Sequence, residues 1–148
     1  MVLPMLLAAC ASAPQSVAST PVSQTASSQA AGQAAKMVGR PYRFGGASPA
    51  AGFDCSGLVQ YSYRQAGIAL PHSTDQQRAA SRAIKVADLR RGDLLFFQQE
   101  GKKHGHVGIY LGGGKFVHAP SSGKTVRSDR LDSPYWKKHL SEARRLSA

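Results

Sequence analysis

A cysteine and two histidines stand in sequence settings that suit covalent catalysis. Cys55 heads an amphipathic stretch, whereas His106 opens and His118 closes two short strand-like segments. A thiol attacks as the thiolate, and a helix start together with an imidazole can bring the pKa of a cysteine to about 3.5–7.5. A triple-glycine turn at 112–114 would place the two histidines on adjacent strands. The set therefore predicts a nucleophile, a base and a residue that orients the base.

Each of these residues also has an ordinary structural interpretation. A cysteine beside an apolar helix face is commonly a buried small side chain, but the Asp-Cys-Ser-Gly context after a glycine-rich loop favours function. His104 is an alternative base. A metal site is a second alternative, although the paired spacings typical of zinc sites are missing, so we expect no metal and no cofactor. The residues of that alternative would be Cys55, His104, His106 and His118.

The segments that carry these residues change from helical to strand periodicity. Apolar residues recur at spacings of three and four over 55–66, which predicts a helix beginning at Cys55. Ser73 and Gln76 resemble a capping box, so a second helix is expected from Ser73 to about Arg82. Helices followed by an antiparallel β-meander predict a single α+β domain. Strands are expected at 93–97, 106–111, 115–118, 125–128 and 143–146, with a short helical turn at 134–136.

The chain is strongly basic. Its 148 residues include 19 Lys and Arg against 8 Asp and Glu, a formal net charge of +11, and all these charges lie between Lys36 and Arg145. A basic surface favours polyanions such as nucleic acid, anionic lipid or an acidic wall polymer. No RNA- or DNA-binding motif accompanies the charge, so we expect no nucleic-acid partner.

The first ten residues resemble the end of a bacterial secretory signal. The apolar run at 2–9 is too short to span a bilayer, which needs about 20 apolar residues, but it fits the apolar part of a signal. Leu7-Ala8-Ala9-Cys10 resembles a lipobox, in which the cysteine is diacylated and becomes the new N-terminus. No basic residue precedes the run, which leaves open whether Met1 is the true start, and a chance apolar N-terminus is the alternative. If Cys10 is lipidated, Cys55 has no disulfide partner, and an unpaired envelope thiol suggests a reactive one.

Residues 11–35 differ in composition from the rest of the chain. They are mainly Ala, Ser, Gln and Thr, carry no charge and lack large apolar side chains other than valine. This composition predicts a flexible tether, and the stretch 28–38, which runs past its end, could turn helical. We therefore expect a signal and lipobox remnant (1–10), a tether (11–35) and a folded domain (36–148).

Four motifs of the expected domain resemble those of NlpC-type cell-wall cysteine peptidases. They are Phe53-Asp54-Cys55-Ser56-Gly57-Leu58-Val59, Arg91-Gly92-Asp93-Leu94-Leu95-Phe96-Phe97, His106-Val107-Gly108-Ile109-Tyr110 and Val117-His118-Ala119. The resemblance covers about residue 36 to the C-terminus, and with the lipobox the whole chain is similar to small Spr-like envelope lipoproteins. It implies a papain-like α+β fold, with N-terminal helices packed on an antiparallel sheet, and hydrolysis of peptidoglycan stem peptides.

The resemblance also implies roles for individual residues. Cys55 would be the nucleophile, His106 the base and His118 the residue that orients His106. Four residues match positions that line the site or contact substrate: Tyr42, Asp54, Ser56 and Ser73. For Asp54, capping of the following helix is an alternative. Gly57 is expected to leave the helix start open to a substrate backbone.

We therefore expect a peptidoglycan endopeptidase that works through a Cys-His-His acyl-enzyme. It would be a monomer on the periplasmic face of the bacterial cell envelope, anchored through lipidated Cys10, and the residue after that cysteine, Ala11, favours the outer membrane. No wall-binding module such as an SH3-like domain is recognisable before the domain, so targeting would depend on the lipid, the tether and the basic surface. The alternatives are an N-acetylmuramoyl-L-alanine amidase-type hydrolase, a non-catalytic wall-binding lipoprotein and an adaptor that recruits another hydrolase. The bond cleaved, at a D-alanine crosslink or a γ-D-glutamyl linkage, stays open.

Overall fold

The computed structural model describes residues 22–147. Four α-helices, one 3-10 helix and eight strands follow one another in this part of the chain. They are α1 (Gln24–Lys36), β1 (Ala47–Ser48), β2 (Gly52–Phe53), α2 (Cys55–Gln65), α3 (Thr74–Ala79), β3 (Ser81–Ile84), η1 (Val86–Asp88), β4 (Leu94–Gln99), β5 (Lys102–Gly112), β6 (Lys115–His118), β7 (Arg127–Arg130), α4 (Pro134–His139) and β8 (Leu140–Leu146). The expected lipobox at Cys10 lies outside the described residues.

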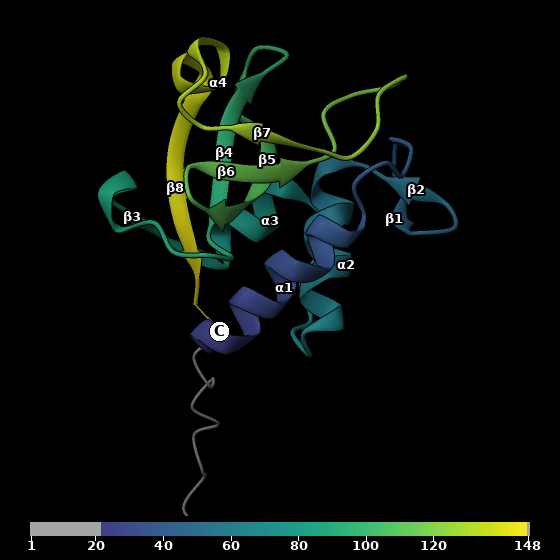
Figure 1. Cartoon of the computed structure of the whole chain (residues 1–148), viewed down its shortest axis with the longest axis horizontal. Helices are drawn as coiled ribbons and strands as arrows, with labels where there is room; N and C mark the ends of the chain where they lie inside the picture. Colours follow the sequence, from purple (N-terminus) through teal and green to yellow (C-terminus); the bar gives the residue numbers. More distant parts are fainter. Residues whose placement is uncertain (1–21, 148) are drawn as a thin grey trace, which may run out of the picture.

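Six strands form one antiparallel sheet in the order β3-β8-β4-β5-β6-β7. Strands β4 to β7 are a meander, as the alternating pattern predicted, and β8 returns from the C-terminal end to pair beside β4 (Figure 1). Helices α1 and α2 lie together against the sheet, whereas α4 lies at the far end of β8 (Figure 1). The expected α+β class, with N-terminal helices on an antiparallel sheet, is confirmed.

The two faces of the sheet bury different apolar clusters, because successive side chains of a strand point to opposite faces. On one face, α1 and α2 cover the larger cluster, which includes Leu58, Val59, Leu94, Phe96, Val107 and Ile109. On the other face, a smaller cluster is covered by α4 and the turns around it and includes Leu95, Phe97, Phe116 and Ala143. The two clusters therefore hold β4 and β5 in place from both faces, and β5 carries His106.

The expected tether is a folded helix over its second half. Residues 24–35 belong to α1, and Ser23 caps this helix by accepting a hydrogen bond from the N–H of Ala26. The sequence argument failed because it required large apolar side chains, whereas α1 is buried through small ones. Its buried residues are Ala26, Ser27, Ala30, Ala31 and Ala34. Small side chains let the helix backbone approach its neighbours closely, so α1 belongs to the domain.

The helix expected from Ser73 to about Arg82 is shorter in the structure. Ser73 is the cap and accepts from the N–H of Gln76, as predicted, but α3 ends at Ala79. Residues 81–84 form β3, which pairs with β8. This pairing joins segments far apart in the sequence, and local periodicity cannot reveal such a partner.

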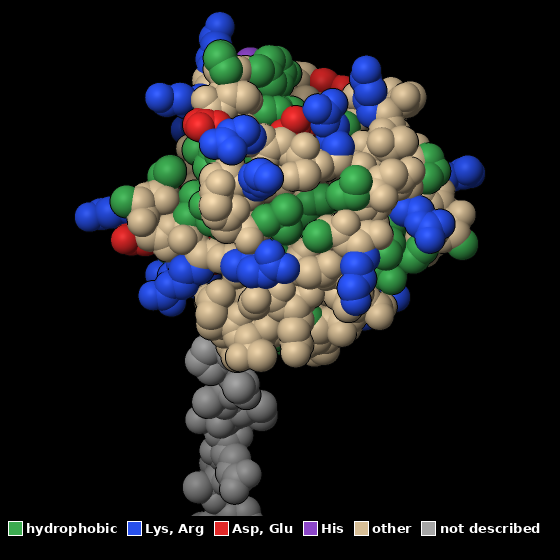
Figure 2. Space-filling view, in the orientation of Figure 1, with side chains coloured by type: hydrophobic (Ala, Val, Ile, Leu, Met, Phe, Trp, Pro, Cys, Tyr) green, Lys and Arg blue, Asp and Glu red, His purple; other side chains and the backbone are tan. Residues whose placement is uncertain are grey.

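Basic side chains are spread over the visible face of the molecule, with few acidic ones among them (Figure 2). This distribution agrees with the formal charge of +11. None of the helices within residues 22–147 has the length and apolar character needed to span a bilayer.

Candidate active site

Cys55 is the first residue of α2, and Asp54 holds the start of that helix. The Oδ1 atom of Asp54 accepts from the N–H of Gly57 at 2.6 Å, and Oδ2 accepts from the N–H of Gly45 at 2.9 Å. The same carboxylate lies 2.9 Å from Nε2 of His72. Asp54 therefore caps α2 and also ties the glycine-rich loop to it, which fixes the position of the cysteine that follows.

Gly57 has a different role from the one expected. A Cβ atom at this position would lie 1.9 Å from the carbonyl oxygen of Gly46 and 2.7 Å from Oδ1 of Asp54. The glycine thus makes room for the protein's own loop rather than for a substrate backbone. The close approach fastens the loop across the first turn of α2.

Cys55 is intermediate between buried and exposed, and its sulfur lies against the backbone of Val107, the residue that follows His106. Its Sγ atom is 3.9 Å from the Thr74 hydroxyl oxygen. Burial raises the pKa of the thiol above its ordinary value, although hydrogen bonds from the backbone of Val107 and the Thr74 hydroxyl act in the opposite direction. The expected depression of the pKa is therefore not found, and the resting cysteine is a thiol whose surroundings can stabilise a thiolate formed during reaction.

His106, His118 and Asp129 form a hydrogen-bonded chain. The Nε2 atom of His106 lies 2.7 Å from Nδ1 of His118, and Nε2 of His118 lies 2.7 Å from Oδ2 of Asp129. A carboxylate only accepts, so His118 donates from Nε2 and, being neutral, accepts at Nδ1. His106 must then donate from Nε2, which leaves its Nδ1 atom as a proton acceptor.

Aromatic rings enclose both histidines. The Trp136 ring of α4 stacks on His106 at 5.9 Å between centroids and meets His118 edge-on at 4.7 Å. Burial, with a smaller effect of His118, lowers the pKa of His106 to about 3. Burial also lowers the pKa of His118, although Asp129 opposes the shift. Both rings are therefore neutral near pH 7, as the hydrogen-bonded chain requires.

Cys55 and His106 line the same pocket, whose volume is ≈ 320 Å³. Tyr42, Asp54 and Ser56 line it as well, together with Thr74. Burial and the nearby Cys55 and Asp54 raise the pKa of Tyr42, so its hydroxyl stays protonated. Ser73 instead lines a neighbouring hollow of ≈ 490 Å³, where it caps α3.

The pocket is the middle of a longer groove. It shares Thr74, Lys102 and Gly105 with the hollow of ≈ 490 Å³, and on its other side it shares Gln99, His106 and Pro120 with a hollow of ≈ 170 Å³ that reaches Trp136. We call these three connected hollows the catalytic groove. An elongated groove with a thiol at its centre suits an extended peptide.

Two further histidines have partners of their own. His104 Nδ1 lies 2.9 Å from the Ser141 hydroxyl and 3.6 Å from Glu142, so the alternative base is engaged outside the His106–His118 pair. His72 lies 2.9 Å from the Asp54 carboxylate. Within residues 22–147, no group of three or more His, Cys, Asp or Glu side chains could hold a metal ion.

Sequence reasoning missed three residues of the site. Thr74 contacts the sulfur, Trp136 packs on the histidines and Asp129 ends the hydrogen-bonded chain. Asp129 lies on β7, which pairs with β6 and places Asp129 opposite Phe116. The strand expected at 125–128 ended one residue before it. Thr74 and Trp136 come from short helices whose placement depends on tertiary packing.

A helix-borne cysteine facing strand-borne histidines across an antiparallel sheet defines the class of papain-like α+β proteins. Residues 39–145 match the NlpC/P60 family, and the chain belongs to that family. It is similar to the probable endopeptidase YafL of Escherichia coli K12, with 45% identity over 75% of this chain and 46% of YafL. It is also similar to the murein DD-endopeptidase MepS/murein LD-carboxypeptidase of the same strain, with 44% identity over 77% of this chain and 60% of that protein.

A solved structure has the same fold. A Staphylococcus aureus protein of the NLP/P60 family, described as similar to lipoprotein, superposes with a TM-score of 0.73 at 38% identity, covering 89% of this chain and 45% of that one. The papain-like fold expected from the motifs is thus confirmed. The chain spans 46% to 60% of the length of the two curated relatives named above.

Proposed function

We propose that this protein is a peptidoglycan endopeptidase, a cysteine peptidase that hydrolyses amide bonds of stem peptides in the bacterial cell envelope. One observation carries the proposal: the His106–His118–Asp129 chain ends at the pocket that also holds Cys55. Membership of the NlpC/P60 family and the similarity to a murein DD-endopeptidase support this substrate class.

In the proposed mechanism, the neutral His106 acts as the base. Its Nδ1 atom takes the Cys55 proton as the sulfur attacks the peptide carbonyl, so the costly charge separation arises only with substrate bound. His118 accepts a hydrogen bond from His106 and stabilises the imidazolium, while Asp129 holds His118 in the required tautomer. His106 then returns the proton to the leaving amine, which gives an acyl-enzyme, and water releases the acyl group by the same steps in reverse.

The start of α2 would stabilise the tetrahedral intermediate. N–H groups at a helix N-terminus point along the positive end of the helix dipole, and the backbone of Ser56 already faces the sulfur. Removing one such donor from an oxyanion site costs about 2.7–4 kcal/mol in other enzymes. Tyr42, Asp54 and Ser56 would contact substrate in the central pocket, and Ser73 in the hollow beside it.

The test is digestion of purified sacculi with the wild-type chain and with Cys55→Ala, followed by mass spectrometry of the released muropeptides. We expect new peptide ends with the wild type and none with the variant. Ends at D-alanine crosslinks would indicate a DD-endopeptidase, and ends within one stem a γ-D-glutamyl hydrolase. Glycan chains stripped of whole stems would instead establish the amidase, and equal digests from both proteins would remove the enzyme proposal in favour of a binding or adaptor lipoprotein.

We also propose that Cys10 is lipidated and anchors the domain on the periplasmic side, at the outer membrane. The proposal is supported by the Leu-Ala-Ala-Cys pattern and by the lipoprotein likeness of the Staphylococcus aureus relative. Palmitate labelling in cells is expected for the wild type and lost in Cys10→Ser. Label retained by the variant would contradict the anchor.

A further inference from the structure

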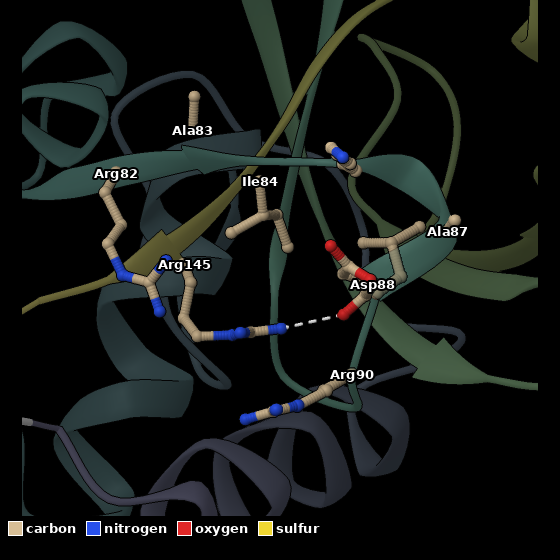
Figure 3. Close-up of a pocket in the computed structure, with 9 residues that line it drawn as sticks. Arg82, Ala83, Ile84, Ala87, Asp88, Arg90 and Arg145 are labelled. Carbon is tan, nitrogen blue, oxygen red and sulfur yellow. Dashed lines mark hydrogen bonds between the residues drawn. The ribbon is translucent and has the colours of Figure 1, made fainter.

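A second hollow lies beside β3 and η1 and shares no lining residue with the catalytic groove. Its volume is ≈ 470 Å³. Four basic residues line it, with one acidic residue among them (Figure 3). The basic residues are Arg82, Lys85, Arg90 and Arg145, and the acidic residue is Asp88. We call this feature the basic hollow.

The basic hollow carries positive charge that the protein itself does not pair. Arg82 on β3 stands directly opposite Arg145 on β8, whose own charge is paired with Asp93. Figure 3 shows Arg145 between Arg82 above and Arg90 below, with the Arg145 side chain extending to Asp88. Within residues 22–147, neither Arg82 nor Arg90 forms an ion pair. A bound anion would therefore meet two guanidinium groups that have no carboxylate partner among the described residues.

Arg145 is held in place for such an anion. Its Nε and Nη2 atoms donate to the Asp93 carboxylate at 2.9 and 2.8 Å, and Nη2 also donates to the Asp88 carbonyl oxygen at 2.9 Å. Among the described residues, no hydrogen bond comes from Nη1 of this guanidinium. A fixed guanidinium with free donors matches the geometry of a phosphate group and loses little entropy on binding.

Apolar side chains border the charges. Ile84 and Leu89 line the basic hollow, and Val86 on η1 is 52% exposed beside them. Basic residues next to an exposed aliphatic side chain are typical of surfaces that rest on a bilayer, where the charges meet lipid phosphates and the apolar group enters the interface.

The first turn of α1 lies next to the basic hollow. The Gln24 side chain, in the first turn of α1, donates to the Arg91 carbonyl oxygen at 2.9 Å, next to Arg90. Figure 1 shows the start of α1 and the end of β8 at the same end of the molecule. We propose that the basic hollow binds the phosphate headgroups of anionic membrane lipids, so that this end of the domain rests on the bilayer. The proposal does not depend on the proposed peptidase activity.

The test is co-sedimentation of the full chain with lipid vesicles, in a Cys10→Ser background that removes the acylation site. Vesicles of phosphatidylcholine are compared with vesicles that also contain phosphatidylglycerol. The variant Arg82→Gln with Arg90→Gln removes two positive charges from the basic hollow. Lys124→Gln with Lys138→Gln removes the same charge from exposed positions elsewhere and serves as the matched control.

We expect phosphatidylglycerol to increase binding of the parent chain, and the arginine variant to lose about thirtyfold of that increase, since each basic residue near an anionic surface contributes about 1 kcal/mol. The lysine control should keep most of it. Without lipid, the arginine variant should melt at about the same temperature or higher, because neither Arg82 nor Arg90 forms an ion pair within the described residues that the substitutions could break. Equal losses in both variants, no effect of phosphatidylglycerol, or a lipid-free arginine variant that is less stable would each overturn the proposal. Digestion of sacculi by the arginine variant should be unchanged.

Discussion

At the scale of single residues, Asp129 decides which nitrogen of His106 is available as a base. Replacing it with Asn turns one acceptor oxygen into an amide donor, so the group no longer fixes the His118 tautomer, and it also removes the charge that raises the pKa of His118. We expect Asp129→Asn to lower kcat/KM on muropeptides by about a hundredfold or more, with little change in KM. The pH profile of kcat/KM should change as well, because the charge that acts on the pKa of His118 is lost. A merely structural defect would instead lower activity equally at all pH values.

The control for this prediction is Asp132→Asn. Asp132 is an exposed carboxylate three residues further along, paired with Arg130 at 2.9 Å, and it has no contact with the histidines. Its replacement should leave kcat/KM unchanged. Equal losses in the two variants would contradict a positioning role for Asp129.

The state of the Cys55 thiol gives a second prediction. Burial raises its pKa, so the thiolate fraction near pH 7 is small in the free protein. In a Cys10→Ser chain, where Cys55 is the remaining cysteine, the rate of alkylation by iodoacetamide should still increase above pH ~8.5, the ordinary thiol pKa. A rate that reaches its plateau below pH 7 would instead indicate a thiolate–imidazolium pair at rest.

Much of the candidate site was predictable at this scale, because Cys55, His106 and His118 lie within short motifs whose types and spacings are set by the chemistry. The electrostatics was not predictable. The helix start and the imidazole suggested an ionised cysteine, but the aromatic enclosure around Trp136 and the burial of the rings favour neutral forms. Desolvation depends on the whole fold, and one sequence does not report it.

At the scale of elements, the glycine-rich loop and α2 depend on each other through Gly57. A Cβ atom at this position would lie 1.9 Å from the Gly46 carbonyl oxygen, which is backbone and must therefore move. We expect Gly57→Ala to lower the free energy of unfolding by about 1–3 kcal/mol and to impair activity, because the loop that approaches Cys55 is displaced. Chemical denaturation and muropeptide release measure the two effects.

Gly32→Ala is the matched control, since Gly32 is also a helical glycine. The nearest atom to its added Cβ would be the end of the Arg91 side chain at 3.4 Å, an ordinary contact. Alanine favours a helix over glycine by about 0.5–1 kcal/mol, so stability should be equal or slightly higher. Similar destabilisation by both changes would show that the loop contact is not the cause.

The elements that sequence reasoning located correctly are those with a local signal. Residues 55–65 have a clear apolar face, and β6 at Lys115–His118 lies directly after the triple-glycine turn. The errors involve elements defined by their neighbours: α1, which is buried through alanines, and β3, which exists because β8 pairs with it. In both cases the stabilising partner is distant in the sequence.

At the scale of the whole molecule, the catalytic groove and the basic hollow are separate surfaces. The catalytic groove is built from the start of α2, α3 and the β4–β5 hairpin, whereas the basic hollow is built from β3, η1 and β8. Because they share no residue, binding at the basic hollow can orient the domain without blocking the groove.

The buried histidines also make the stability of the whole domain depend on pH. The pKa of His106 is about 3 in the folded state and about 6.5 in an unfolded chain, and the pKa values of His104 and His118 are shifted in the same direction. Below about pH 6.5 the unfolded state therefore binds more protons than the native state. The free energy of unfolding consequently decreases as the pH falls from about 6.5 toward 3. Each such histidine contributes up to about 1.4 kcal/mol per pH unit. Urea denaturation should give a free energy of unfolding that is nearly constant from pH 7 to 8 and falls between pH 6.5 and 4.5, and His106→Gln should reduce that slope. A slope that is the same in wild type and variant would mean that His106 is protonated, or reached by water, in the folded protein.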